Sequence, residues 1–342
     1  MKLTTGLTAL ATALAIALPA TAQDYRLTLH HFLGERAPVH GQMLVPWAER
    51  VEELSGGAVE IEIFPSMTLG GRPPELVSQA RDGVVDLIWT LNGYTPGLFP
   101  RTEVFELPTV FVNDPAATNL AMRAIFDDHL AADYAGLEVM FLHVHAGNGF
   151  QMVERAVRAP ADLEGLSLRT PSRSGAWVIE ALGANPVAMP VPDLPQALSR
   201  GTVDGALVPW EIIPALRLQE QTEYQIEGAG MARMGTSVFQ VSMNAARWNS
   251  LPPEVQAAFR AASDEAWLSE VGALWRANDD AGIAMAVAAG NSHIVLSPDE
   301  TDAMFAPLES VVERWIGEVS ANGIDGAALV ETARNAIAAA GE

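Results

Sequence analysis

The sequence predicts an α/β protein of two domains, and three observations support this. Nearly continuous apolar strands alternate with amphipathic helices after the first 22 residues, a pattern typical of mostly parallel sheets covered by helices on both faces. The chain has 342 residues, more than one ordinary hydrophobic core organises. Hydrophobic residues make up 49% of it, enough for well-packed cores in a chain that contains no cysteine.

The first 22 residues are typical of a secretory leader. Lys2 supplies the positive start, residues 7–18 are apolar, and Ala20-Thr21-Ala22 is a small-residue cleavage site. The apolar run is too short to span a membrane comfortably, and no later stretch offers a span. We therefore expect export to a bacterial periplasm, cleavage after Ala22 and no membrane insertion of the mature chain. The alternative is an uncleaved anchor.

The charge of the chain limits its partners. The formal net charge is −22, and Lys2 is the only lysine. Such an acidic surface argues against nucleic acid, whose phosphates need basic patches. A small anionic ligand would have to be held by local arginines against the overall field.

The first expected domain begins after the leader. Alternation and helical periodicity predict strands at 27–31, 59–64, 84–90 and 137–145, with helices at 43–54, 74–81 and 120–129. Gly147-Asn148-Gly149 follows, and glycine permits the backbone changes of a hinge at low steric cost.

A second α/β unit follows the hinge. We expect a strand that ends at Arg169, a helix around Trp177, and then the elements 185–187 (strand), around Ala197 (helix), 203–208 (strand) and 209–218 (helix). A strand at 238–243 precedes one helical run over 253–288, on the order of 50 Å if unbroken, and a strand at 293–296 with two more helices completes the chain. The expected domains are 24–147 with 236–275, and 148–235 with 276–342, with a ligand cleft between them.

Arg169 is the principal candidate for ligand binding. In open α/β sheets the strand ends and the loops after them face the ligand crevice. An arginine there is rigid, always charged and able to bind a carboxylate through two parallel hydrogen bonds. The structural alternative is an arginine that ties two surface loops together.

Enzyme motifs are missing from the sequence. There is no cysteine nucleophile, no G-x-S-x-G, H-E-x-x-H or G-x-G-x-x-G pattern and no P-loop. We therefore expect no catalytic residue, no cofactor and no resident metal. A secreted metal-dependent enzyme built on His30, His31, His40 and Glu211 stays open as an alternative. His143 and His145 share a strand face, a spacing that suits zinc but more simply a packed pair.

The order of the elements and a series of short motifs resemble the solute-binding proteins of TRAP transporters, the tripartite ATP-independent periplasmic importers. The motifs are Pro46-Trp47-Ala48-Glu49, Leu54-Ser55-Gly56-Gly57, Phe64-Pro65, Leu69-Gly70-Gly71, Asp82-Gly83-Val84-Val85-Asp86, Phe105-Glu106-Leu107-Pro108, LEGLSLRTP at 163–171, Gly183-Ala184-Asn185-Pro186, Val203-Asp204-Gly205 and Trp248-Asn249-Ser250-Leu251-Pro252. Together they cover essentially the whole mature chain.

The resemblance implies a two-lobed periplasmic binding protein fold with hinge-crossing strands and a long domain-spanning helix. It also implies a salt bridge from Arg169 to a ligand carboxylate, closure of the lobes, and delivery to the TRAP membrane permease subunits. The sequence departs from sialic-acid-binding members, because Gly147-Asn148-Gly149-Phe150-Gln151 contains no second arginine. A smaller or more apolar carboxylate is therefore expected. A solute-binding protein of an ATP-driven importer is the alternative within this architecture.

Seven further residues are candidates for ligand contact because they lie at strand ends, near the hinge, or after the glycine turn before a helix. They are Asn92, Trp210, Glu211, Arg72, Asn148, Gln151 and His31. Each has a structural alternative, such as a core tryptophan for Trp210 or a solvated turn for Arg72. Glu211 with Gln151 could also help to hold a bridging cation. Arg173, close to Arg169, is expected to be solvated or supporting.

Overall fold

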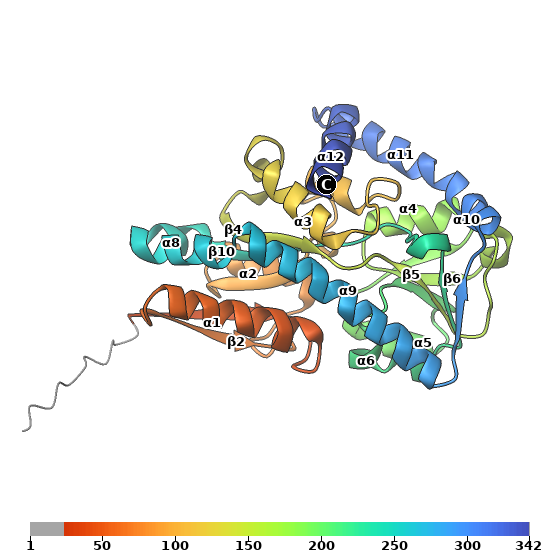
Figure 1. Ribbon diagram of the computed structural model, residues 1–342, viewed down its shortest axis with the longest axis horizontal. Helices are drawn as coiled ribbons and strands as arrows, with labels where there is room; N and C mark the ends of the chain where they lie inside the picture. Colours follow the sequence, from red (N-terminus) through yellow and green to blue (C-terminus); the bar gives the residue numbers. More distant parts are fainter. Residues whose placement is uncertain (1–23, 342) are drawn as a thin grey trace, which may run out of the picture.

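The computed structural model describes residues 24–341, which form two β-sheets with helices around each. The two sheets define two lobes, which lie side by side along the long axis of the molecule (Figure 1). The two-lobed α/β fold that the sequence predicts is confirmed. The predicted leader and its cleavage site lie outside the described residues.

The first lobe contains a five-stranded sheet in the order β2-β1-β3-β10-β4. Its strands are β1 (Tyr25–His31), β2 (Val59–Phe64), β3 (Leu87–Leu91), β4 (Leu137–Val144) and β10 (Val238–Asn244). The second lobe contains a six-stranded sheet in the order β11-β9-β5-β8-β6-β7. Its strands are β5 (Gly149–Met152), β6 (Ser167–Thr170), β7 (Asn185–Ala188), β8 (Gly205–Val208), β9 (Tyr224–Glu227) and β11 (Ser292–Val295).

Both sheets are mixed, whereas the sequence pattern indicates mostly parallel ones. β1 pairs parallel with β2 and β3, and β6 pairs parallel with β7 and β8. All antiparallel pairs involve β10, which lies between β3 and β4, or β5, which lies between β8 and β9. β5 is the first strand after the chain passes into the second lobe, and β10 is the first strand after it returns to the first lobe. Both run antiparallel to their neighbours.

Within the described residues, three connections join the two sheets. The chain passes from β4 to β5 through residues 145–148 and returns from β9 to β10 through residues 228–237. The third connection is α9 (Glu265–Ala288), which crosses both lobes diagonally (Figure 1). Gly147 has a φ of +96°, and an added Cβ would lie 2.5 Å from the Cβ of Arg233. Only glycine fits this crossing, where the two chain connections touch.

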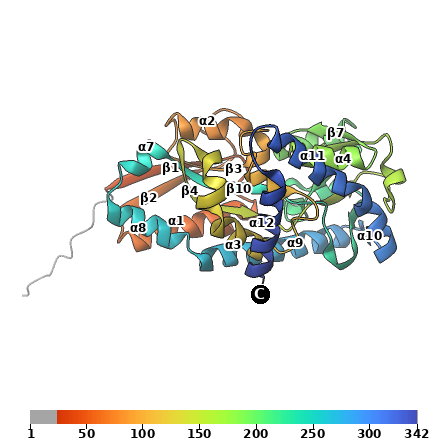
Figure 2. The same ribbon diagram turned by 90° about the horizontal axis from the view of Figure 1, so that it is seen from above.

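Helices cover the sheets of both lobes. The first lobe carries α1 (Val45–Leu54), α2 (Leu76–Arg81), α3 (Pro115–Ala124), α7 (Ala245–Asn249) and α8 (Pro253–Ala262). The second carries α4 (Arg173–Ala181), α5 (Leu194–Ser199), α6 (Ile213–Leu216), α10 (Pro298–Phe305) and α11 (Glu309–Ser320). The last helix, α12 (Gly326–Ala340), packs against α3 of the first lobe (Figure 2). The residue boundaries of the expected domains stay a prediction. α12 falls within the expected second domain (276–342), although it packs against the first lobe.

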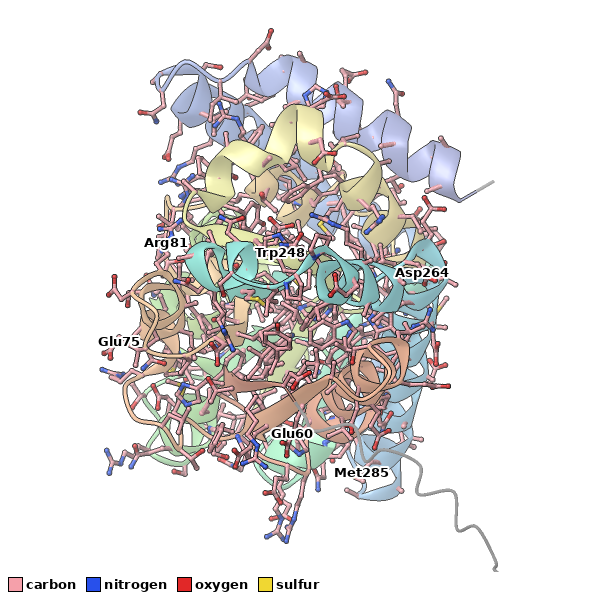
Figure 3. The ribbon with its side chains drawn as sticks, turned by 90° about the vertical axis from the view of Figure 1, so that its left-hand side faces the viewer. Glu60, Glu75, Arg81, Trp248, Asp264 and Met285 are labelled. Atoms are coloured by element: carbon pink, nitrogen blue, oxygen red, sulfur yellow. The ribbon has the colours of Figure 1, made fainter. Side chains whose placement is uncertain are left out.

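The single helix expected over 253–288 is wrong, because α8 and α9 are separate helices. Figure 3 shows α8 between Trp248 and Asp264, with α9 continuing from there toward Met285. The Asp264 carboxylate accepts a hydrogen bond from the Trp267 backbone N–H at 2.9 Å, so it caps a new helix and ends the old one. With 24 residues, α9 is roughly 36 Å long.

Candidate ligand-binding site

A narrow cavity of about 30 Å³ lies between the lobes and is lined by residues from both of them. Its volume suffices for about two water molecules, so a larger ligand requires the lobes to separate or the walls to move. The lining is mostly apolar or aromatic: Phe32, Leu33, Trp89, Leu91, Tyr94, Pro171, Val191, Val208, Pro209, Ile212, Phe239 and Trp275. Its other members are His145, Asn148, Arg169, Glu211 and Ser237.

Arg169 lies in β6, between β7 and β8 of the second sheet, and its side chain is buried in the cavity wall. Its Nε donates to the Met189 carbonyl at 3.1 Å and its Nη1 to the Leu207 carbonyl at 3.5 Å. Nη2 has no hydrogen-bond partner among residues 24–341. Burial lowers the pKa of Arg169, while Tyr94 and Asp193 oppose this shift. Among the described residues, the site therefore contains a buried guanidinium whose Nη2 can donate a hydrogen bond to a ligand.

Parallel aromatic rings form one wall of the cavity. Trp89 stacks on Phe239 with ring centroids 4.9 Å apart and an angle of 4° between the rings, and Phe32 stacks on Trp89 at 4.7 Å. His143 continues the stack with Phe239 at 5.0 Å and with Trp275 at 5.4 Å. Because rings from β3, β4, β10 and α9 stack on one another, this wall of the cavity is rigid and apolar.

Tyr94, in the loop after β3, brings the two lobes together beside Arg169. Its hydroxyl accepts a hydrogen bond from the Val191 backbone N–H of the second lobe at 2.8 Å. Its ring meets Phe32 edge to face at 5.2 Å. Burial raises the pKa of Tyr94, so the hydroxyl keeps its proton. No sequence pattern singled out this residue.

Five polar residues line the cavity where the connections between the lobes pass it. His145 and Asn148 belong to the first connection, Ser237 to the second and Trp275 to α9, while Glu211 follows β8. Each carries a buried polar atom without a hydrogen-bond partner in the described part of the chain: His145 Nε2, Asn148 Oδ1, Glu211 Oε2, Ser237 Oγ and Trp275 Nε1. We call these five residues the hinge wall.

The surroundings of two ionisable groups of the hinge wall favour their neutral forms. Burial raises the pKa of Glu211 well above its usual value, and the nearby Asp279 carboxylate adds to this shift. Burial also lowers the pKa of His145 well below its usual value. The Gly147 backbone N–H donates to His145 Nδ1 at 3.0 Å, so the proton of the neutral ring lies on Nε2.

Of the eight residues predicted for the site, the structure brings Arg169, Asn148 and Glu211 to the cavity. Asn92 does not line it: its amide nitrogen donates to the Tyr134 hydroxyl at 2.8 Å and its oxygen accepts from Gln240 at 2.7 Å. Both ends of this side chain are therefore engaged in packing the first lobe. The other four predicted residues, Arg72, His31, Trp210 and Gln151, do not line this cavity either.

Arg72 and His31 also lie away from the cavity. The Arg72 side chain is 71% exposed and lies 3.6 Å from the Asp193 carboxylate across the lobe boundary. His31 is buried in the first lobe, where its Nε2 pairs with His40 Nδ1 at 3.0 Å. The first is a surface contact and the second a core contact.

Trp210 and Gln151 are buried behind the cavity in the second lobe. The Trp210 ring lies 5.0 Å from the Arg233 guanidinium, which forms ion pairs with Glu227 at 2.7 Å and Asp279 at 2.8 Å. Gln151 is fully buried in β5, with neither amide atom paired among residues 24–341. Trp210 is thus the core tryptophan that was the alternative, while its neighbour Glu211 reaches the cavity.

Comparison with known proteins places these features in context. The model of the DctP family, described as bacterial extracellular solute-binding protein, family 7, matches residues 29–318. A solute-binding protein of a TRAP transporter from an unidentified marine microbe, specific for aromatic acids and solved with 3-hydroxybenzoate, is 36% identical with a TM-score of 0.91. The match covers 94% of this chain and 100% of that one.

A TRAP solute-binding protein from Rhodoferax ferrireducens, solved with copurified benzoate, is also 36% identical, with a TM-score of 0.89 and coverage of 92% and 98%. The 2,3-diketo-L-gulonate-binding periplasmic protein of Escherichia coli is 26% identical over 220 residues, which are 63% of this chain and 65% of that protein. The match to this curated relative thus spans just under two thirds of its length.

Proposed function

Because the chain belongs to the DctP family of bacterial extracellular solute-binding proteins and is a solute receptor of the TRAP type, we propose that it captures an aromatic carboxylic acid at Arg169. The observation that carries the proposal is the buried guanidinium in the cavity wall, whose Nη2 has no hydrogen-bond partner among residues 24–341. A buried charge without a partner is costly, and a carboxylate removes that cost through charge-assisted hydrogen bonds. Asn148 and Glu211 are retained as further ligand contacts.

The aromatic wall supports an aromatic rather than an aliphatic acid. Trp89 and Phe239 stack on each other and give the cavity a rigid apolar wall, against which a flat ligand ring can bury its surface with little loss of conformational freedom. The two solved relatives with 36% identity bind 3-hydroxybenzoate and benzoate, which are flat aromatic carboxylates. The aromatic wall and the ligands of these two relatives independently favour an aromatic carboxylic acid.

The receptor would hand its ligand to the membrane permease subunits of a TRAP importer. This partner follows from the family and from the expected export to the periplasm. Among residues 24–341, no helix is both long and apolar enough to cross a membrane. A ligand that prefers the closed form shifts the open–closed equilibrium toward that form. The closed form would then present to the permease a surface that the open form lacks.

Calorimetric titration of benzoate tests the role of Arg169. The Arg169→Gln variant keeps hydrogen-bond donors but loses the charge, and should weaken binding by about 100-fold or more, because a buried charge pair is broken. Arg26→Gln is the control, since Arg26 is an exposed residue that pairs with Glu60 and does not line the cavity. If folded Arg169→Gln binds benzoate as tightly as the wild type, the proposal is wrong.

The two alternatives have less support. An ATP-driven importer would not be expected to use a receptor of the DctP family. For a metal-dependent enzyme, His30 and His31 would have to meet Glu211, but His30 pairs with Gln79 and His31 with His40. In the described part of the chain, no three His, Cys, Asp or Glu side chains are grouped closely enough to bind a metal.

A further inference from the structure

We propose that the hinge wall is a second polar subsite, which binds an uncharged hydroxyl group of the ligand. On this proposal, which rests on the proposed function, the preferred ligand is a hydroxylated aromatic acid rather than a plain aromatic acid or an aromatic dicarboxylate. The hinge wall consists of His145, Asn148, Glu211, Ser237 and Trp275, as defined above.

Unpartnered buried atoms carry the argument. The five residues are between 0% and 5% exposed, and each has one polar atom without a hydrogen-bond partner among residues 24–341. Such groups are rare in folded proteins because each one costs about 1–3 kcal/mol. Five of them around one cavity indicate a surface that is completed by something entering the cavity.

The hinge wall is separate from the contacts of Arg169. The guanidinium donates to the carbonyls of Met189 and Leu207, neither of which belongs to the hinge wall. Four residues of the hinge wall lie on connections between the lobes and the fifth, Glu211, follows β8, whereas Arg169 lies within β6. The cavity therefore offers two distinct polar regions, joined by aromatic and aliphatic side chains.

The chemistry of the hinge wall selects a group that both donates and accepts. His145 Nε2–H and Trp275 Nε1–H are donors, Asn148 Oδ1 is an acceptor, and Ser237 can act as either. Glu211 also acts as either, because its raised pKa favours the protonated acid. A hydroxyl group satisfies both kinds of partner.

Charged groups suit the hinge wall less well. A second carboxylate would need a cation, but the lowered pKa of His145 keeps its ring neutral. Arg233, whose charge acts on both His145 and Glu211, is already paired with Glu227 and Asp279. An ammonium group would need an anion, which the protonated form of Glu211 does not provide. The neutral forms of His145 and Glu211 thus favour an uncharged ligand group at the hinge wall.

The test compares three acids that differ at one ring position: benzoate, 3-hydroxybenzoate and benzene-1,3-dicarboxylate. Calorimetry on the wild type should give 3-hydroxybenzoate the highest affinity, about tenfold above benzoate, as expected for one well-made buried hydrogen bond. Equal affinity for benzoate and 3-hydroxybenzoate, or a preference for the dicarboxylate, would overturn the inference.

Two variants assign the preference to the hinge wall. Ser237→Ala removes one hydroxyl, and His145→Asn removes Nε2–H while retaining an oxygen that can accept from Gly147 N–H. In both variants the ratio of the two dissociation constants should move toward one. Ser242→Ala is the matched control, because Ser242 is a buried serine of β10 that bonds to Gln240 and does not line the cavity.

The outcomes separate this inference from the proposed function. An unchanged ratio in both Ser237→Ala and His145→Asn, with the thermal unfolding temperature of each close to that of the wild type, would disprove the hydroxyl subsite. Arg169→Gln would still weaken binding of both acids in that case. If Arg169→Gln has no effect on either acid, the proposed function itself fails.

Discussion

His143 is a histidine that the fold holds in its neutral form. It lies in β4 and stacks against the rings of Phe239 and Trp275, and its Nε2 accepts a hydrogen bond from Trp89 Nε1 at 2.9 Å. Because Nε2 is an acceptor, the proton of the neutral ring lies on Nδ1, 3.4 Å from the Val144 carbonyl. Burial lowers the pKa of His143 to about 3. The aromatic wall of the cavity thus depends on an uncharged ring.

This neutral histidine predicts a loss of stability in acid. In the unfolded chain a histidine has a pKa of about 6.5, so between about pH 6.5 and 3 the unfolded state binds the additional proton. The free energy of unfolding therefore falls as the pH is lowered through that range. From pH 7 to 5, His143 should account for a loss of about 2 kcal/mol.

The variant His143→Phe isolates this contribution. Urea unfolding at pH 7 and pH 5 should show that the free energy of unfolding falls by about 2 kcal/mol less in the variant than in the wild type. His129→Gln, which removes an exposed histidine, is the control and should keep the wild-type difference. Should His143→Phe lose as much as the wild type, the native His143 must already carry its proton at pH 5.

At the scale of single residues, the sequence predicted Arg169 as a ligand-binding residue but did not indicate most of the other polar residues of the cavity. An arginine at the end of an apolar strand is conspicuous, because a buried charge needs a reason. His145, Ser237 and Trp275 lie in apolar segments, where the same letters usually indicate core packing. Their role depends on which atoms remain unpartnered, and that is decided by Gly147 N–H and other contacts that no sequence pattern contains.

Among the elements, the break between α8 and α9 determines where the long helix begins. Asp264 caps α9 through the Trp267 N–H, and its other carboxylate oxygen pairs with Arg50 of α1 at 2.9 Å. Ser263 accepts from Trp47 Nε1 at 3.0 Å. These contacts fix the start of α9 against the first lobe, so its far end is positioned over the second.

Removal of this cap should destabilise the protein measurably. Asp264→Ala loses both the cap and the ion pair, and should lower the free energy of unfolding by about 1 kcal/mol, the usual value of an N-cap. Asp264→Asn keeps a capping oxygen and loses only the charge, so it should retain most of the stability. Chemical denaturation of the three proteins gives the comparison, and a loss as large in Asp264→Asn as in Asp264→Ala would assign the effect to the ion pair instead.

The elements themselves were largely predictable, but their boundaries and directions were not. Hydrophobic periodicity indicated most of the strands and helices, because burial on one face or both leaves its period in the sequence. It could not show that Ser263-Asp264 ends a helix within an apolar run, since both residues also occur inside helices. Nor could it show that β5 and β10 run antiparallel, because strand direction follows from the path of the chain between lobes.

At the scale of the whole molecule, closure of the lobes rests on a few polar contacts outside the cavity. Arg173 at the start of α4 pairs with Glu103 of the first lobe at 2.5 Å, and the Ser174 hydroxyl donates to the Glu106 carboxylate at 2.8 Å. Glu103 and Glu106 lie in the connection between β3 and β4. These contacts exist only when the lobes are together, so they contribute to the population of the closed form.

Weakening this contact should therefore lower ligand affinity from a distance. Arg173→Gln removes the ion pair with Glu103 across the lobes, together with the 3.1 Å pair to Glu318 of its own lobe, and the apparent dissociation constant rises as the closed form becomes less populated. Because the pair is only partly buried, we expect roughly a fivefold loss of affinity for benzoate in calorimetry. Arg173 does not line the cavity, so direct ligand contact does not explain such a loss.

Arg314 provides a matched control for Arg173. Both guanidinium groups lie over the Trp177 ring, at 5.1 Å for Arg173 and 4.7 Å for Arg314. Arg314 of α11 pairs with Glu180 of α4 at 2.7 Å, so its contact stays within the second lobe, where Figure 2 shows α11 beside α4. Arg314→Gln should thus leave benzoate affinity unchanged. If both variants lose affinity equally, the effect comes from packing around Trp177; if neither does, the Arg173–Glu103 pair does not contribute to closure.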